Sequence, residues 1–199
     1  MNEHRGFPAL TVDEYKSVLE RWSEPHRKWH SSKHLMRLFL NIEEDPDLTE
    51  SDREMLHYVA LFHDAIYAPL NSDNEEKSAQ MAAYYLHKYP RKDEVVAAIL
   101  ATKTHQSKTE LEKKFNAWDC AILRETDWDK LRHYEKCIAA EFREVGWITY
   151  RRERSKFLRQ ASLDYENPVL AELADAVEAG PREKHWVAGQ KPEKSGRSL

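Results

Sequence analysis

Residues 55–64 read MLHYVALFHD, an apolar run of helical character that ends in the adjacent pair His63 and Asp64. Apolar residues spaced three and four apart recur along almost the whole chain, and no stretch combines β-branched alternation with hairpin turns. The chain has only five glycines, which removes phosphate-cradling loops of the GxGxxG and GxxxxGK types. The sequence therefore predicts an all-α fold in which side chains or a metal must hold any phosphate.

Length and charge limit the class of protein. With 199 residues, the chain is long enough to bury a substantial core in one domain. Charged residues make up 33% with both signs mixed, and the net charge of -4 argues against dedicated nucleic-acid or membrane-surface binding. No apolar run is long enough to cross a membrane and no leader is evident, so we expect a cytoplasmic protein. Cys120 and Cys137 are expected to be reduced thiols.

Capping residues, prolines and glycines divide the chain into helices. Thr11 is a predicted N-cap with Glu14 as its capping-box partner, and Thr49 or Ser51 is expected to cap the helix that leads to His63. The expected helices cover about residues 12–22, 25–44, 50–63, 73–89, 93–103, 111–123, 128–145, 149–161 and 168–180. We expect one compact bundle over residues 1–165, a short C-terminal helix in 166–180 and a flexible tail over 181–199.

Four residues are candidate metal ligands. His63 and Asp64 place an imidazole beside a carboxylate at a helix end, and His34 and Asp119 lie in other largely apolar, helix-like segments. First-row divalent ions accept mixed imidazole and carboxylate ligands. A lone histidine on an apolar face is more often a hydrogen-bonded core group. The prediction of a metal site therefore depends on the combination of all four residues. Because an unpaired buried carboxylate is unfavourable, Asp119 in particular suggests a nearby cation.

The order His34, then His63 and Asp64, then Asp119 on an all-α chain resembles the HD superfamily of metal-dependent phosphohydrolases, named for that His-Asp pair. A closer resemblance is to a bacterial and phage branch of predicted HD-domain hydrolases, and it covers about residues 10–160. The stretches that carry it are EPHRKWHSSKHL at 24–35, ALFHDAIY at 60–67, DNEEKSA at 73–79, ILATKTH at 99–105 and WDCAIL at 118–123.

This resemblance implies hydrolysis of a phosphate ester or anhydride, with a nucleotide as the leading class of small-molecule substrate. It implies a divalent cofactor, one of Mn²⁺, Co²⁺, Ni²⁺, Fe²⁺, Zn²⁺ or Mg²⁺, which would activate the attacking water. Asp64 would orient that water, with catalytic help from His105 and from Glu75 or Glu76. The expected substrate-binding residues are His30, Lys103, Tyr67, Arg27, Lys33 and Lys77.

Each of these secondary residues also has an ordinary structural interpretation. Lys103 and His105 fit a solvated helix C-terminus, where the helix dipole favours cations, and Glu75 and Glu76 fit a first helical turn by the same rule. His30 lies one turn before His34 and could face the substrate, support a ligand or sit at the rim. Exposed basic residues are common, and aromatic residues are more often part of a core than stacking platforms.

The chain also departs from the pattern of the branch. Ala139 stands where the branch has an arginine, and Glu153 stands where a glycine precedes the later arginine, which puts substrate or surface contacts in doubt more than the metal. Ala65 and Ile66 replace the Glu-Asp pair of HD hydrolases of guanosine tetraphosphate, which disfavours an alarmone hydrolase. Two alternatives stay open: a catalytically silent metal- or nucleotide-binding module, and a plain helical interaction protein. Because helical HD proteins often associate, a homodimer is the expected oligomeric state.

Overall fold

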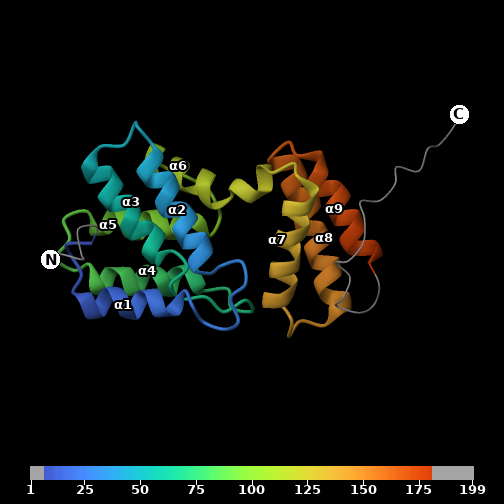
Figure 1. Ribbon diagram of the computed structural model, residues 1–199, viewed down its shortest axis with the longest axis horizontal. Coiled ribbons are helices and arrows are strands. Elements are labelled where there is room, and N and C mark those ends of the chain that lie inside the picture. The colour runs from blue at the N-terminus through green and yellow to red at the C-terminus, as the bar shows by residue number, and fades with distance from the viewer. Residues whose placement is uncertain (1–6, 181–199) are drawn as a thin grey trace, which may run out of the picture. The chain divides into compact units, whose positions relative to one another are not determined.

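The computed structural model describes residues 7–180, and these residues form helices joined by turns and loops, without strands (Figure 1). The predicted all-α class is confirmed. The chain divides into two compact units, residues 1–119 and 120–199, so the division falls inside the range 1–165 that was expected to form one bundle. In residues 7–180, none of the helices combines the length and apolar character that crossing a membrane requires. The predicted flexible tail, residues 181–199, lies outside the described residues.

The N-terminal unit is built around one central helix. Its elements are α1 (Val12–Arg21), α2 (Ser32–Glu44), α3 (Glu50–Phe62), α4 (Asn74–Tyr85), α5 (Lys92–Thr102) and α6 (Glu110–Asp119). Helix α3 contacts each of the other five. It can do so because Met55, Leu56 and residues 58–62 are all buried, which surrounds the helix with apolar side chains rather than giving it one apolar stripe. The stretch that ends at His63 is therefore the middle of the core.

Two helix starts agree with the predicted caps. The Thr11 hydroxyl accepts a hydrogen bond from the backbone N–H of Glu14 at 3.3 Å, and the Glu14 carboxylate accepts one from the backbone N–H of Thr11 at 2.7 Å. Thr49, rather than Ser51, caps α3, and its hydroxyl accepts from the backbone N–H of Asp52 at 3.1 Å. Local side-chain chemistry therefore determines where α1 and α3 begin.

The predicted helix over 25–44 is wrong in its first turns, because α2 begins at Ser32. Residues 23–31 form turns instead, and the buried Arg27 guanidinium donates hydrogen bonds to the backbone carbonyls of His30, Asp64 and Ala65 at 3.2, 2.8 and 3.2 Å. These tertiary hydrogen bonds outweigh the helix-start signal of Pro25. Two other helices are shorter than expected, since α4 ends at Tyr85 and α7 ends at Glu141.

The C-terminal unit contains a short 3-10 helix, η1 (Ala121–Arg124), followed by α7 (Trp128–Glu141), α8 (Trp147–Asp164) and α9 (Pro168–Ala179). Helices α8 and α9 form a close pair, and α7 also packs on α9. Asn167 precedes Pro168, the predicted start of the last helix, and its amide donates to the carbonyls of Leu123 and Glu125 at 2.9 and 2.8 Å. Cys120 and Cys137 remain thiols, as expected.

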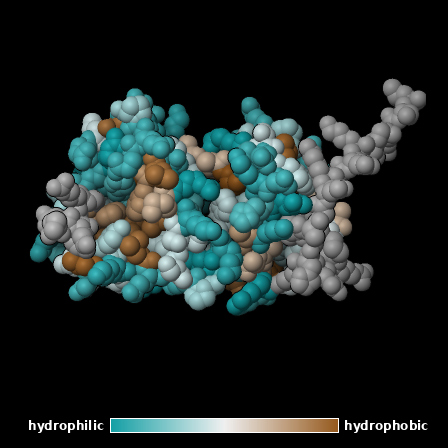
Figure 2. Space-filling view, in the orientation of Figure 1, coloured by the Kyte–Doolittle hydropathy of each residue, from teal (hydrophilic) through white to brown (hydrophobic). Residues whose placement is uncertain are grey.

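With 33% charged residues in the sequence, a mainly polar surface is expected. The face in Figure 2 is mainly hydrophilic and carries smaller apolar areas. On α2, the side chains of Met36 and Leu40 are 57% and 52% exposed, whereas His34, Leu35 and Leu38 are buried. Helix α2 thus directs its opposite face into the N-terminal unit, and His34 lies on that inner face.

Candidate metal centre

His63 lies at the C-terminal end of α3, and its backbone N–H donates to the carbonyl of Val59 at 2.9 Å. Its ring Nδ1 lies 3.0 Å from the carbonyl oxygen of Ala60. A carbonyl can only accept, so Nδ1 carries a hydrogen, and whenever the ring is neutral its lone pair is on Nε2. Among the described residues, the buried Nε2 makes no hydrogen bond of good geometry, although an oxygen of Asp64 lies 3.4 Å and an oxygen of Asp119 lies 3.6 Å from it. This is the tautomer of a histidine that binds a metal through Nε2.

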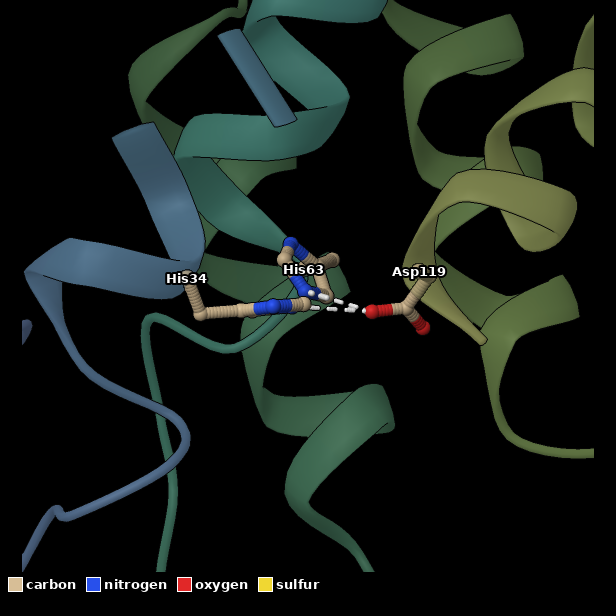
Figure 3. A group of neighbouring side chains, drawn as sticks. All are labelled: His34, His63 and Asp119. Atoms are coloured by element: carbon tan, nitrogen blue, oxygen red, sulfur yellow. Dashed lines mark hydrogen bonds and ion pairs between the residues drawn. The ribbon is translucent and has the colours of Figure 1, made fainter. Parts of the chain in front are cut away.

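His34 and Asp119 complete the centre from two other helices (Figure 3). His34 lies in the first turn of α2, and its Nε2 is 2.9 Å from Oδ1 of Asp119, the last residue of α6. The same Asp119 oxygen is 3.6 Å from Nε2 of His63. The three side chains offer ligand atoms that all lie within 4.8 Å of one another. The fold thus brings together three predicted ligands that are spread over 85 positions.

Asp64 lies beside this group of three rather than within it. Its Oδ2 is 3.4 Å from Nε2 of His63, and its side chain is 16% exposed. Burial raises the pKa of Asp64, but the positive charge on His63 more than offsets this and lowers that pKa to about 2. Asp64 is therefore an ionised carboxylate at the edge of the centre.

The electrostatics of the centre require a positive charge. Burial raises the pKa of Asp119, but the nearby imidazole of His105 and the hydrogen bond with His34 hold this pKa well below its ordinary value. Burial lowers the pKa of His63, but the carboxylates of Asp64 and Asp119 raise it well above its ordinary value. Either protons on the histidines or a divalent cation can balance the two carboxylates. Imidazole nitrogen and carboxylate oxygen together suit Mn, Fe, Co, Ni and Zn ions.

Two aromatic residues hold the imidazoles in place. The ring of Trp22 lies 6.3 Å from the ring of His34 and 5.3 Å from that of His63, and the Trp22 indole N–H donates to the carbonyl of Leu61 at 2.9 Å. Phe115 of α6 lies edge-on to His63 at 5.3 Å. Both aromatic side chains are fully buried. Sequence reasoning did not single out either residue, because each looks like any other core aromatic.

His30 and Tyr67, two predicted substrate-binding residues, lie next to the centre. The ring of His30 is 6.2 Å from the ring of His34 and 4.5 Å from that of Tyr67. The ring of His26 is nearly parallel to Tyr67 at 6.1 Å, and its Nε2 is 2.9 Å from the Tyr67 carbonyl oxygen. The turns before α2 and the segment after α3 thus place a group of aromatic rings beside the candidate ligands.

Arg27, also predicted to bind substrate, is buried, and its guanidinium contacts groups of the protein itself. Besides donating to three backbone carbonyls, its guanidinium donates to the Glu24 carboxylate at 3.0 Å and lies 5.5 and 5.3 Å from the rings of Trp22 and Tyr67. The side chain is fully buried. Because two of those carbonyls belong to Asp64 and Ala65, Arg27 holds the turn that carries the His-Asp pair.

His105 approaches the centre from the turn after α5. Its Nε2 is 3.8 Å from Oδ2 of Asp119, and its side chain is 41% exposed. Its φ of 54° lies in the left-handed region, which is strained for a residue with a side chain. His105 is thus both near the ligands and accessible to solvent, as its predicted role requires.

The remaining predicted residues lie on the surface or pair with one another. Lys103 forms an ion pair with Glu76 and donates to the carbonyl of Ser72 at 2.6 Å. Lys77 forms an ion pair with Asp73, one turn earlier on the helix, at 2.9 Å. Lys33 is exposed and Glu75 is half-buried. The contacts described above for the centre do not involve these residues, so their predicted roles stay predictions.

Comparison of the chain with protein-family models, with curated proteins and with solved structures finds no match in any of the three. The resemblance to HD phosphohydrolases therefore stays a prediction from the motifs.

Proposed function

We propose that this protein is a metal-dependent phosphohydrolase that cleaves a phosphate ester or anhydride, with a nucleotide as the leading substrate class. The observation that supports this most is the convergence of His34, His63 and Asp119, in which the buried Nε2 of His63 makes no hydrogen bond of good geometry among the described residues but lies within 3.6 Å of two carboxylates. A divalent ion among these side chains would give that lone pair a partner and would balance the ionised carboxylates.

When bound, a divalent ion supplies Lewis acidity, which polarises a phosphoryl oxygen and lowers the pKa of a coordinated water. The side chains around it have separate tasks. Asp64, with its pKa of about 2, stays ionised and can accept a hydrogen bond that orients the attacking water. His105 is half-exposed, and its ring can donate a hydrogen bond to a phosphoryl oxygen, which offsets the charge that develops there.

The rings of His30 and Tyr67 support a nucleotide as substrate. They lie 4.5 Å apart and adjoin His34, so an aromatic base could pack beside them while its phosphate reaches the ligands. Stacking between a base and an aromatic side chain contributes about 1–3 kcal/mol and depends little on the identity of the base. The identity of the base is therefore left to experiment.

The test begins with protein that has been stripped of metal and reloaded with manganese, cobalt, nickel, magnesium or zinc. We expect at least half an equivalent of tightly bound metal, as a rough criterion, and release of phosphate from one or more nucleoside mono-, di- or triphosphates. Substituting His63→Gln should lower both metal content and turnover by about 100-fold, because it removes a ligand. The matched control is His87→Gln, which changes an exposed histidine at the end of α4.

Two results would contradict this proposal. Turnover that survives in His63→Gln would show that the three side chains are not the active centre. Stoichiometric metal binding without phosphate release from any nucleotide would favour the alternative, a catalytically silent binding module. The expected homodimer and cytoplasmic location stay predictions.

A further inference from the structure

One polar side chain of α6 reaches back to the turn that carries His105. This turn, residues 103–109, connects α5 to α6. Asn116 of α6 is only 7% exposed, and its amide Nδ2 donates a hydrogen bond to the hydroxyl of Ser107 at 3.0 Å. Ser107 follows His105 by two positions in the sequence, so this hydrogen bond anchors the turn close to the backbone of His105.

Glu112, a second buried polar residue of α6, has a role that helix formation explains. Its backbone N–H donates to the hydroxyl of Thr109 at 3.2 Å, and its carboxylate accepts from the backbone N–H of Thr109 at 3.3 Å. This reciprocal pair is a capping box, which begins the helix. Asn116 has no such local role, because its partner lies nine positions earlier in the chain.

Asn116 is unfavourable for the stability of α6. Its Oδ1 is buried and has no hydrogen-bond partner among the described residues, and asparagine is a poor helix former. Its partner Ser107 is exposed, so water can replace the amide there. An apolar residue of similar size would remove the unpartnered oxygen without leaving Ser107 unsatisfied. The stability of α6 therefore does not explain this asparagine.

His105 is also held in an unfavourable conformation. Its φ of 54° lies in the left-handed region, where the β-carbon of an L-residue is crowded. Residues in such conformations persist only where surrounding contacts hold them, and they cluster at functional sites. The hydrogen bond between Asn116 and Ser107 is a contact of this kind, because it restrains the turn immediately after His105.

The same helix presents Asp119 to the metal centre. Figure 3 shows one oxygen of Asp119 directed at His34 and His63, and the other oxygen, Oδ2, is 3.8 Å from Nε2 of His105. Asn116 precedes Asp119 by three residues, so both side chains lie on one side of α6. Helix α6 therefore carries a candidate ligand and also the residue that anchors the turn of His105.

We propose that Asn116 is a positioning residue for His105 in the phosphohydrolase reaction. Its hydrogen bond to Ser107 holds the turn so that the ring of His105 stays beside Asp119, where it can donate to a phosphoryl oxygen. This inference rests on the proposed function and adds to it a residue that acts only through Ser107 and His105. Displacement of such a group by about 1 Å can lower the rate by about 100-fold.

Two variants remove the hydrogen bond from opposite ends. Asn116→Leu replaces the amide by an apolar group of similar size, and Ser107→Ala changes an exposed residue. Each should lower kcat for the hydrolysed nucleotide by about tenfold or more and leave KM within about twofold, because the contact of His105 forms in the transition state. The matched control is Gln106→Ala, which changes an exposed neighbour in the same turn and should leave kcat unchanged.

Two further measurements separate positioning from structural support. Bound metal and the urea midpoint of unfolding should not fall in Asn116→Leu, since the substitution removes an unpartnered buried oxygen. In a His105→Ala background, Asn116→Leu should cause no further loss of kcat, because the residue it positions is already absent. A further tenfold loss in that background, or a loss of metal in Asn116→Leu, would overturn the proposal.

The ordering of His105 can be measured without turnover. In metal-free protein labelled with ¹³C-histidine, relaxation of the His105 ring should show motion of larger amplitude in Asn116→Leu and Ser107→Ala than in the unaltered protein and in Gln106→Ala. Unchanged ring motion in both variants would overturn the positioning role, whether or not the protein hydrolyses a nucleotide. Increased ring motion without hydrolysis of any nucleotide by the unaltered protein would instead support the positioning role and contradict the proposed function.

Discussion

Replacing Arg27 with methionine should destabilise the N-terminal unit and weaken metal binding even when no substrate is present. Methionine keeps the apolar stem between Trp22 and Tyr67 but removes the donors to the carbonyls of His30, Asp64 and Ala65. A buried acceptor left without its donor costs about 1–3 kcal/mol. Three such carbonyls, partly relieved by water, give an expected loss of about 3–5 kcal/mol in the free energy of unfolding.

The assay is urea unfolding followed by circular dichroism, with metal affinity measured on the same protein. Metal affinity should fall about tenfold or more, because Arg27 holds the turn that carries the His-Asp pair. The control is Lys28→Met, which changes an exposed neighbour and should alter stability by no more than about 0.5 kcal/mol. Unchanged stability and metal affinity in Arg27→Met, together with a raised KM alone, would refute the positioning role and restore the predicted contact with substrate.

Three further outcomes follow from the structure. Asp64→Asn should keep its helicity but lose metal-dependent hydrolysis, since a neutral amide is a poor substitute for the carboxylate; an active, metal-replete variant would contradict this assignment. Trp22→Phe should lower the free energy of unfolding in urea by about 1–3 kcal/mol, because it removes the hydrogen bond to Leu61 and part of the packing on His63; no loss would show that the indole is dispensable. Burial raises the pKa of Tyr89 to about 12, above its unfolded value near 10, so this ring stabilises the fold below pH about 10 and that contribution is lost as pH rises toward 12. Urea unfolding at pH 9 and 11 should show the decline, and Tyr89→Phe should make it shallower; an equal slope would exclude Tyr89 as a source.

The parts of the structure that depend on local chemistry could be predicted from the sequence. Thr11 and Thr49 cap their helices as expected, because a cap needs only a side chain and the backbone three residues later. The convergence of His34, His63 and Asp119 was predicted from the residue types and from their order along the chain. Helical periodicity alone would not have predicted it. Periodicity places a residue on a face of a helix but does not say which helices meet.

The parts that depend on long-range partners could not be predicted. Arg27 looked like an exposed phosphate binder until the fold placed its guanidinium against carbonyls 37 and 38 positions away. Lys103 forms an ion pair with Glu76, 27 positions away, which the sequence did not indicate, and its predicted contact with substrate stays a prediction. In both cases the sequence shows only that the residue is charged. The fold determines which carbonyl or carboxylate oxygen lies close enough to contact it.

Metal binding at His63 can be tested by its effect on stability, because in the neutral form of the ring the lone pair on Nε2 needs a cation. A ligand that binds only the folded state at a hundred times its dissociation constant stabilises that state by about 2.7 kcal/mol. Metal at that concentration should therefore stabilise the unaltered protein and His87→Gln equally, and the stabilisation should be lost in His63→Gln. If metal stabilised His63→Gln as much as the unaltered protein, His63 would not be a ligand and the centre would have to be reassigned.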